Sequence, residues 1–377
     1  MRGKSEAQSP KPGIRSGSGW KPSLGGERKT FRISAFGFLV FGLRSAALLA
    51  GMTLLLAPAR AGNASPDSAT DRRTVILVVG APGEPEFGSN FVQQAALWEK
   101  ACAQTDCRRL TLGLDTGRPT NDHDRLQQIL AREPKEGRGE LWLVLIGHGT
   151  FDGQEAKFNL RGPDVSAGEL AQWLQPVHRP LAVINTASCS APFLAKLSAT
   201  NRVIITATRS GAEQNFARFG QYLAETLTDP HADLDKDGQV SLLEAFLAAA
   251  RRVGEFYQTA GRLATEHALL DDNGDGLGTP ADWFRGVRAV KKAKGSAAVD
   301  GLLAQQFDLV PSEAERRLTP EQRARRDALE RAVLALREKK TQMAEDDYYR
   351  RLEALLLELA RSGEAETDDH AIPKATN

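Results

Sequence analysis

Two apolar runs, each followed by a reactive side chain, constrain the fold of this chain more than any other feature. The first run is Leu141–Ile146, and His148 follows it between two glycines. The second is Leu181–Ile184, and Cys189 follows it after a short polar stretch. Uninterrupted apolar runs of this length are typical of strands buried on both faces of a parallel sheet. Because chemistry in such sheets gathers beyond the carboxyl ends of the strands, we expect His148 and Cys189 to leave the same edge.

The other apolar runs alternate with helical patterns. Alternation of this kind predicts an α/β fold, a doubly wound parallel sheet with helices on both faces. The expected strands are Thr74–Val79, Arg108–Leu114 and Arg202–Ala207, and the expected helices are Phe91–Gln104, Asp122–Ala131, Ser166–Leu174 and Pro192–Leu197. A sixth strand is hard to find, and the best candidate is Leu263–Leu270.

The N-terminus carries the features of an export signal. Residues 1–30 are rich in glycine, serine, proline and basic residues, an apolar stretch runs from Phe31 to Leu56, and small residues surround Ala61. This pattern predicts a signal peptide over residues 1–61, followed by a linker over 62–73, and hence a periplasmic or extracellular protein. The alternative is an uncleaved membrane anchor over Phe31–Leu56 that tolerates Arg44. Only in that case do we expect contact with a membrane.

The net charge bears on nucleic-acid binding, and the cysteine content bears on disulfide formation. The net charge is +1, and this balance gives no reason to expect nucleic-acid binding. Of the three cysteines, Cys102 and Cys107 are close enough in sequence to form a disulfide, which leaves Cys189 as the odd thiol. A buried, reduced Cys102 is the alternative, because it follows Phe91 and Trp98 at helical spacing.

The paired histidine and cysteine indicate nucleophilic chemistry. A neighbouring histidine can keep a cysteine as its thiolate, which is the nucleophilic form. The glycines on either side of His148 allow the backbone to approach a substrate closely. The combination predicts a cysteine hydrolase, whereas each residue alone is more often structural.

These residues resemble a known family. The Gly-His-Gly segment and Ala187-Ser188-Cys189, each after a buried run, are similar to those of the caspase-like cysteine peptidases and in particular of the legumain-like branch. The resemblance covers roughly Thr74 to Leu227. It implies a parallel α/β sheet and a Cys-His dyad that hydrolyses peptide bonds. In this family pattern Cys189 is the nucleophile, His148 the general acid and base, and the N–H groups of Gly149 and Cys189 form the oxyanion hole.

The resemblance also implies roles around the dyad. Glu86 matches the position of the legumain asparagine that orients the histidine, with a solvated loop acid as the alternative reading. Gly147 replaces an acid of the legumains, and their charged pocket residues fall near Gly88 and Gln221, so the cleavage preference stays open. The stretch Thr206–Ala217 is similar to the segment that lines the legumain specificity pocket, and its candidate substrate-binding residues are Arg209, Glu213, Gln214 and Asn215.

A twelve-residue acidic stretch matches the calcium loop of an EF-hand. It runs from Asp233 to Glu244, with a glycine at the sixth position and helical sequence on both sides. The expected ligands are Asp233, Asp235, Asp237, the backbone carbonyl of Gln239, Ser241 directly or through water, and a bidentate Glu244. We therefore expect a structural Ca²⁺ here. The alternative is a solvated acidic turn that caps the second helix.

A second acidic stretch begins in the same way. Its candidate ligands are Asp271, Asn273 and Asp275, but it ends on Asp282 where an EF-hand has glutamate. A shorter acid reaches poorly as a bidentate ligand, so the sequence predicts either a weak calcium site or an Asx-rich turn.

The remaining residues complete the expected organisation. Residues 74–290 form the caspase/legumain-like domain with its EF-hand-like loop at 233–244, 291–361 form a charged helical segment, and 362–377 form a disordered tail. The sequence names no partner for the C-terminal helices. The expected function is an exported cysteine endopeptidase that acts on a protein or peptide substrate and holds structural calcium. The alternative is a catalytically inactive calcium-binding interaction protein on the same scaffold.

Overall fold

The structure, a computed structural model, describes residues 71–115, 121–296 and 298–364. The predicted signal peptide, most of the linker and nearly all of the predicted tail lie outside these residues. Within them, no helix combines the length and the apolar character that a bilayer crossing requires.

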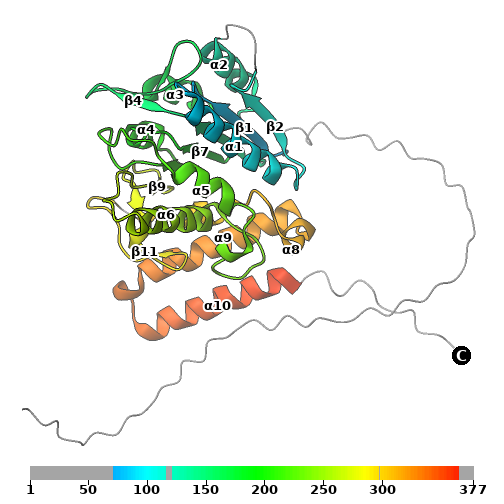
Figure 1. Ribbon diagram of the computed structural model, residues 1–377. Helices are drawn as coiled ribbons and strands as arrows, with labels where there is room; N and C mark the ends of the chain where they lie inside the picture. Colours follow the sequence, from blue (N-terminus) through cyan, green and yellow to red (C-terminus); the bar gives the residue numbers. More distant parts are fainter. Residues whose placement is uncertain (1–70, 116–120, 297, 365–377) are drawn as a thin grey trace, which may run out of the picture. The chain divides into compact units, whose positions relative to one another are not determined.

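A seven-stranded sheet forms the centre of the molecule (Figure 1). Five strands run parallel, whereas β9 is antiparallel to both of its neighbours, β8 and β10. The prediction of an α/β fold with a largely parallel sheet is confirmed. In spatial order the strands are β10 (Thr279–Pro280), β9 (Leu269–Asp271), β8 (Arg202–Thr206), β7 (Leu181–Asn185), β3 (Leu141–Ile146), β1 (Thr74–Val79) and β2 (Arg108–Leu112).

The central strands are buried along their whole length because both faces of the sheet are covered. Every residue of β1, β3 and β7 is buried. Alternate side chains enter two separate apolar clusters, since successive residues of a strand point to opposite faces. One cluster contains side chains of α1 (Pro85–Cys102), α5 (Phe219–Thr226) and α6 (Leu242–Thr259), and the other contains side chains of α2 (Asp122–Arg132), α3 (Ala167–Leu174) and α4 (Ala191–Leu197).

Local sequence signals explain where several helices begin. Pro85 starts α1, six residues before the predicted start, because proline fits the first turn of a helix and its missing N–H costs nothing there. Ser166 with Glu169, and Ser241 with Glu244, form capping boxes at the starts of α3 and α6.

The far edge of the sheet differs from the prediction. The candidate sixth strand, Leu263–Leu270, is wrong over most of its length, because only its last two residues belong to β9. Residues 263–268 instead form hydrogen bonds to the segment between β8 and α5, through Glu266 and His267. The Glu213 carboxylate accepts the backbone N–H of His267, and the Glu266 carboxylate accepts the N–H groups of Arg218 and Phe219.

Short elements complete the described residues. A small sheet consists of β4 (Gly149–Phe151), β5 (Ala156–Phe158) and β6 (Val165–Ser166), and a hairpin of β11 (Phe284–Arg285) and β12 (Arg288–Ala289). The turns η2 (Pro230–Ala232), η3 (Ala281–Trp283) and η4 (Lys340–Gln342) are 3₁₀ helices. The C-terminal helices are α7 (Leu302–Gln305), α8 (Glu313–Arg317), α9 (Pro320–Glu338) and α10 (Glu345–Glu364).

The C-terminal residues join the core and then form a helical pair. Phe307 packs on Trp142 of β3 with ring centroids 5.6 Å apart. Further along, α9 and α10 run side by side (Figure 1). On α9, the apolar side chains of Leu329, Val333 and Leu336 are buried.

Candidate active site

His148 and Cys189 follow the carboxyl ends of adjacent parallel strands. In the register of β3 and β7, Leu145 pairs with Asn185, so the two chains leave the sheet at the same level. The loops beyond the strands are in direct contact: the N–H of Gly149 donates to Ser188 Oγ over 3.3 Å, and that hydroxyl donates to the Gly149 carbonyl over 3.2 Å. The residue after His148 therefore touches the residue before Cys189.

Cys189 lies in a strained and covered turn. Its φ is +55°, a left-handed value that residues other than glycine adopt rarely and often at functional sites. The residue is 2% exposed and belongs to neither apolar cluster. Burial raises the pKa of the thiol, and a hydrogen bond from Ser188 partly opposes that rise. At neutral pH this sulfur is held mainly as the thiol.

A hydroxyl pair fixes the turn after Cys189. Thr208 Oγ1 lies 3.2 Å from Ser190 Oγ and accepts the N–H of Ala191 over 3.0 Å. The N–H of Thr208 in turn donates to Ser190 Oγ over 3.2 Å. Both hydroxyl residues are buried, so these bonds set the path of the chain between Cys189 and α4. Sequence reasoning missed Thr208, because nothing in its local pattern distinguishes it from a strand-end residue.

His148 is held by aromatic rings and one backbone carbonyl. The rings of Phe87 and Phe91 meet the imidazole edge-on, with centroids 4.7 Å and 5.0 Å away, and Phe216 lies at 6.3 Å. Burial among them lowers the pKa of His148, whereas a hydrogen bond to the Pro82 carbonyl raises it. The neutral imidazole, which can accept a proton from a thiol, is therefore favoured.

Glu86 lies on the first turn of α1 and is exposed. In the parts of the chain that the structure covers, no hydrogen bond or ion pair connects it to His148, whose backbone partner is Pro82. The contacts that do position the imidazole come from the same helix, through Phe87 and Phe91. Their spacing of four residues was the available signal, because it places both rings on one helical face.

The loops that carry His148 and Cys189 are in contact, but the two reacting side chains are not joined to each other. Among the described residues no hydrogen bond joins the imidazole of His148 to the sulfur of Cys189. Both N–H groups that the family resemblance assigns to the oxyanion hole already have acceptors, Ser188 Oγ for Gly149 and the Glu213 carbonyl for Cys189, the latter at 2.9 Å. A substrate carbonyl must replace these acceptors before it can bind there.

The expected substrate-binding residues lie between β8 and α5. Arg209, Gln214 and Asn215 are exposed. Glu213 is only 13% exposed, and its carboxylate is occupied within the protein. It accepts the backbone N–H groups of Arg209 and His267 over 3.0 Å and 3.2 Å, and Nδ1 of His267 over 2.6 Å. Gln214 and Asn215 are thus free to contact a ligand, whereas Glu213 holds its own segment.

The first acidic loop has a donor set that suits a hard cation. Oxygens of Asp233, Asp235 and Asp237 lie within 4.8 Å of one another. The Asp233 carboxylate accepts the N–H groups of Lys236 and Gly238, and both of these residues have positive φ. Burial, together with the nearby carboxylates, raises the pKa of Asp237 to about 6. Clustered carboxylates at this spacing fit Ca²⁺.

The other expected ligands of this loop lie around the same turn. Glu244 is buried and accepts the N–H groups of Leu234 and Asp235. Ser241 caps α6, so its hydroxyl is used locally. The side chain of Gln239 donates to Asp237 and to Asp308, which leaves its backbone carbonyl as the group for a cation.

The second acidic loop repeats the turn but not the cluster. The Asp271 carboxylate accepts the N–H groups of Gly274 and Gly276, the fourth and sixth residues of its loop. Asp233 accepts the N–H groups at the same two positions of the first loop. However, Asn273 donates its amide to Ser296 and Ala298, and Asp275 caps Leu277. Within residues 71–115, 121–296 and 298–364, only the first loop gathers three acidic groups this closely.

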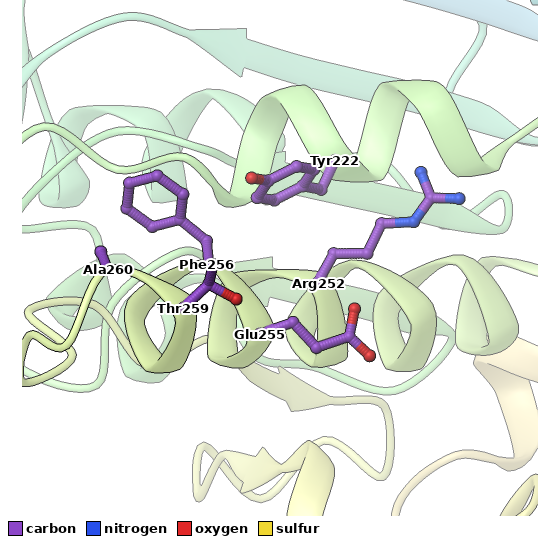
Figure 2. A pocket seen from close by; sticks show the side chains of 6 residues that line it. All are labelled: Tyr222, Arg252, Glu255, Phe256, Thr259 and Ala260. Atoms are coloured by element: carbon purple, nitrogen blue, oxygen red, sulfur yellow. The ribbon is translucent and has the colours of Figure 1, made fainter.

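A cavity of about 400 Å³ lies between α5 and α6 and is separate from the Cys-His site. Figure 2 shows Tyr222 on one helix facing Arg252 on the other. Neither His148 nor Cys189 lines it. The lining residues are Tyr222, Arg252, Glu255, Phe256, Thr259 and Ala260.

Comparisons with known proteins give likenesses of structure alone. No protein-family description and no curated protein sequence matches the chain. The Drosophila initiator caspase Dronc superposes with a TM-score of 0.38 at 13% identity, over 61% of this chain and 94% of that one. Caspase-1 from Spodoptera frugiperda gives 0.34 at 9% identity, over 54% and 87%, and a Geobacter sulfurreducens protein gives 0.32 at 13%, over 48% and 89%.

Proposed function

We propose that this protein is a cysteine endopeptidase in which Cys189 is the nucleophile and His148 the general acid and base. The observation that carries the proposal is the contact between Gly149 and Ser188. It joins the histidine-bearing and cysteine-bearing loops beyond the carboxyl ends of β3 and β7. Chemistry in sheets of this kind occurs at that edge.

The proposed reaction uses groups that these loops supply. His148, neutral at rest, takes the thiol proton of Cys189 as the sulfur attacks the peptide carbonyl. The N–H groups of Gly149 and Cys189 then donate hydrogen bonds to the developing oxyanion. His148 returns the proton to the leaving amine, and a water molecule hydrolyses the thioester. This step releases the acyl product and restores the thiol.

The proposal places the protein outside the cytoplasm, with calcium as a structural ion. Asp233, Asp235, Asp237 and Glu244 would hold Ca²⁺, together with the Gln239 carbonyl. The ion would fix the loop that enters α6, and α6 packs against α5. Its contribution is to stability and not to bond cleavage, because a ligand that binds only the folded state stabilises it.

A catalytically inactive, calcium-binding interaction protein is the second candidate. Two observations favour it: Cys189 is 2% exposed, and both expected oxyanion donors are occupied. Both candidates share the scaffold and the acidic loop, so only the reactivity of Cys189 separates them.

The test is labelling of the full chain with a peptide acyloxymethyl ketone, read at each cysteine by peptide mass spectrometry. An endopeptidase would modify Cys189 selectively, and His148→Ala would abolish that modification. A matched control is His178→Ala, because His178 is exposed and lies away from both loops. Equal labelling of Cys189 in the wild type and in His148→Ala would refute the proposed dyad.

A further inference from the structure

The segment between β8 and α5, residues 209–215, blocks the Cys189 N–H. The Glu213 carbonyl accepts that N–H over 2.9 Å. Under the proposed function, the same N–H donates to the oxygen of the scissile peptide bond. A substrate carbonyl must therefore compete with the Glu213 carbonyl for the Cys189 N–H. Whatever holds Glu213 in place also controls access to the site.

The Glu213 side chain ties this segment to a distant part of the chain. Its carboxylate accepts Nδ1 of His267 over 2.6 Å and the backbone N–H of the same residue over 3.2 Å. A hydrogen bond in which one partner is charged contributes more to stability than one between neutral groups. The side chain thus fixes the position of its own backbone carbonyl above Cys189.

The far end of this tie is itself immobilised. Glu266, next to His267, is 2% exposed, and it accepts the N–H groups of Arg218 and Phe219 at the start of α5. Tyr257 of α6 also contacts its carboxyl group at 3.2 Å. His267 therefore lies on a fixed part of the chain, whereas the 209–215 segment carries four exposed residues, Arg209, Ala212, Gln214 and Asn215.

A second contact holds the middle of the segment. A Cβ atom on Gly211 would lie 2.4 Å from a ring carbon of Phe151 in β4, so only glycine allows the backbone to rest on that ring. This contact is independent of the Glu213–His267 pair. The closed position is thus defined at Gly211 by packing and at Glu213 by hydrogen bonds.

We propose that residues 209–215 are an autoinhibitory strap that closes the Cys189 site, and that the Glu213–His267 pair keeps it closed until a peptide main chain displaces the Glu213 carbonyl. This inference rests on the proposed function. It adds that binding of the extended substrate, and not the chemistry, must break the internal hydrogen bonds. The apparent affinity for the substrate is then lower than the intrinsic affinity, in proportion to the fraction of molecules that are open.

The test measures how fast iodoacetamide alkylates Cys189 in the full chain, read site by site by peptide mass spectrometry. His267→Ala removes the Nδ1 donor, whereas His267→Asn keeps a donor at a similar position. We expect alkylation of Cys189 to be roughly 10-fold faster or more in His267→Ala and close to wild type in His267→Asn. Gly211→Ala, which pushes the strap off Phe151 without touching the pair, should also accelerate it.

Cys102 provides an internal control, because it is buried at the end of α1 and remote in sequence from the strap. Faster alkylation of Cys189 with Cys102 still protected supports the strap, and if His267→Ala also exposes Cys102, Gly211→Ala decides. Unchanged alkylation of Cys189 in both variants, with Cys102 protected, would overturn the inference.

The proposed function fails in a different way. If the variants open the site to iodoacetamide but the peptide ketone labels Cys189 without dependence on His148, the strap covers an inactive thiol. If the variants leave the alkylation rate of Cys189 unchanged but ketone labelling still depends on His148, the endopeptidase proposal stands and the strap proposal fails.

Discussion

Ser188 holds Gly149 through a single hydroxyl, which accepts the glycine N–H over 3.3 Å and donates to the glycine carbonyl over 3.2 Å. A Cβ on Gly149 would lie 2.3 Å from the Ser188 carbonyl oxygen, so the two backbones are as close as a glycine permits. This relationship aligns the two loops of the site, and it also occupies one of the two expected oxyanion donors.

Ser188→Ala should therefore weaken the link between the loops. We expect the free energy of unfolding to fall by about 1 kcal/mol, the ordinary net contribution of one partly buried hydrogen-bonding group. Urea denaturation measures it, with Ser89→Ala as the matched control, because Ser89 bonds Pro85 within an exposed helical turn. A loss no larger than that of the control would contradict the structural role of Ser188.

The three thiols should differ in reactivity in an order that the sequence does not predict. Cys107 is partly exposed, and the Cys102 thiol, Thr105 and the nearby Arg73 lower its pKa to about 6. Cys189 is buried, and burial raises its pKa. In the wild type, iodoacetamide should thus alkylate Cys107 first, since the thiolate is the reacting form. Peptide mass spectrometry of a time course checks this; faster alkylation of Cys189 than of Cys107 would contradict the described burial.

Stability should depend on pH through His148. Because burial lowers its pKa, the unfolded chain takes up a proton near its ordinary pKa of about 6.5 while the folded chain does not. This contribution is complete above that pH and is lost as the pH falls toward the folded pKa. The difference in unfolding free energy between the wild type and His148→Gln should therefore decrease from about pH 7.5 to pH 5.5. A difference in unfolding free energy that stays constant over this pH range, measured by urea denaturation, would show that the imidazole titrates alike in the folded and unfolded chains.

Calcium should raise the melting temperature through the first acidic loop. At a free concentration of about 100 times Kd, a ligand that binds only the folded state adds about 2.7 kcal/mol. We expect a chelator to lower the melting temperature of the wild type and to leave Asp235→Ala unchanged. Asp275→Ala, in the second loop, should keep most of the response. A wild-type transition that a chelator does not move would remove the calcium proposal.

The sequence predicted the parts of the fold that depend on burial along a strand. The strands β1, β3 and β7 were identifiable because each contains an uninterrupted apolar run, and β3 and β7 fix where His148 and Cys189 emerge. By contrast, β9 has three residues and lies between β8 and the edge strand β10, so it leaves no periodic pattern. The predicted sixth strand was misplaced for that reason.

The immediate surroundings of the site were less predictable. The contact between Glu213 and His267 joins residues 54 positions apart and depends on how α6 returns the chain to the sheet. Nothing local marks either residue as a partner of the other. The same holds for Thr208 and Ser190, which are 18 positions apart and meet only because β7 and β8 are neighbours.

The packing of Phe307 on Trp142 affects when the sheet can complete its native contacts during synthesis of the chain. Arg73, directly before the first strand, also donates to the Leu309 carbonyl, 236 positions further along the chain. Asp272 accepts the N–H groups of Gly301 and Ala304 and so fixes α7, which precedes Phe307. The first strands of the sheet therefore complete their native contacts only after Phe307 and Leu309 have been synthesised.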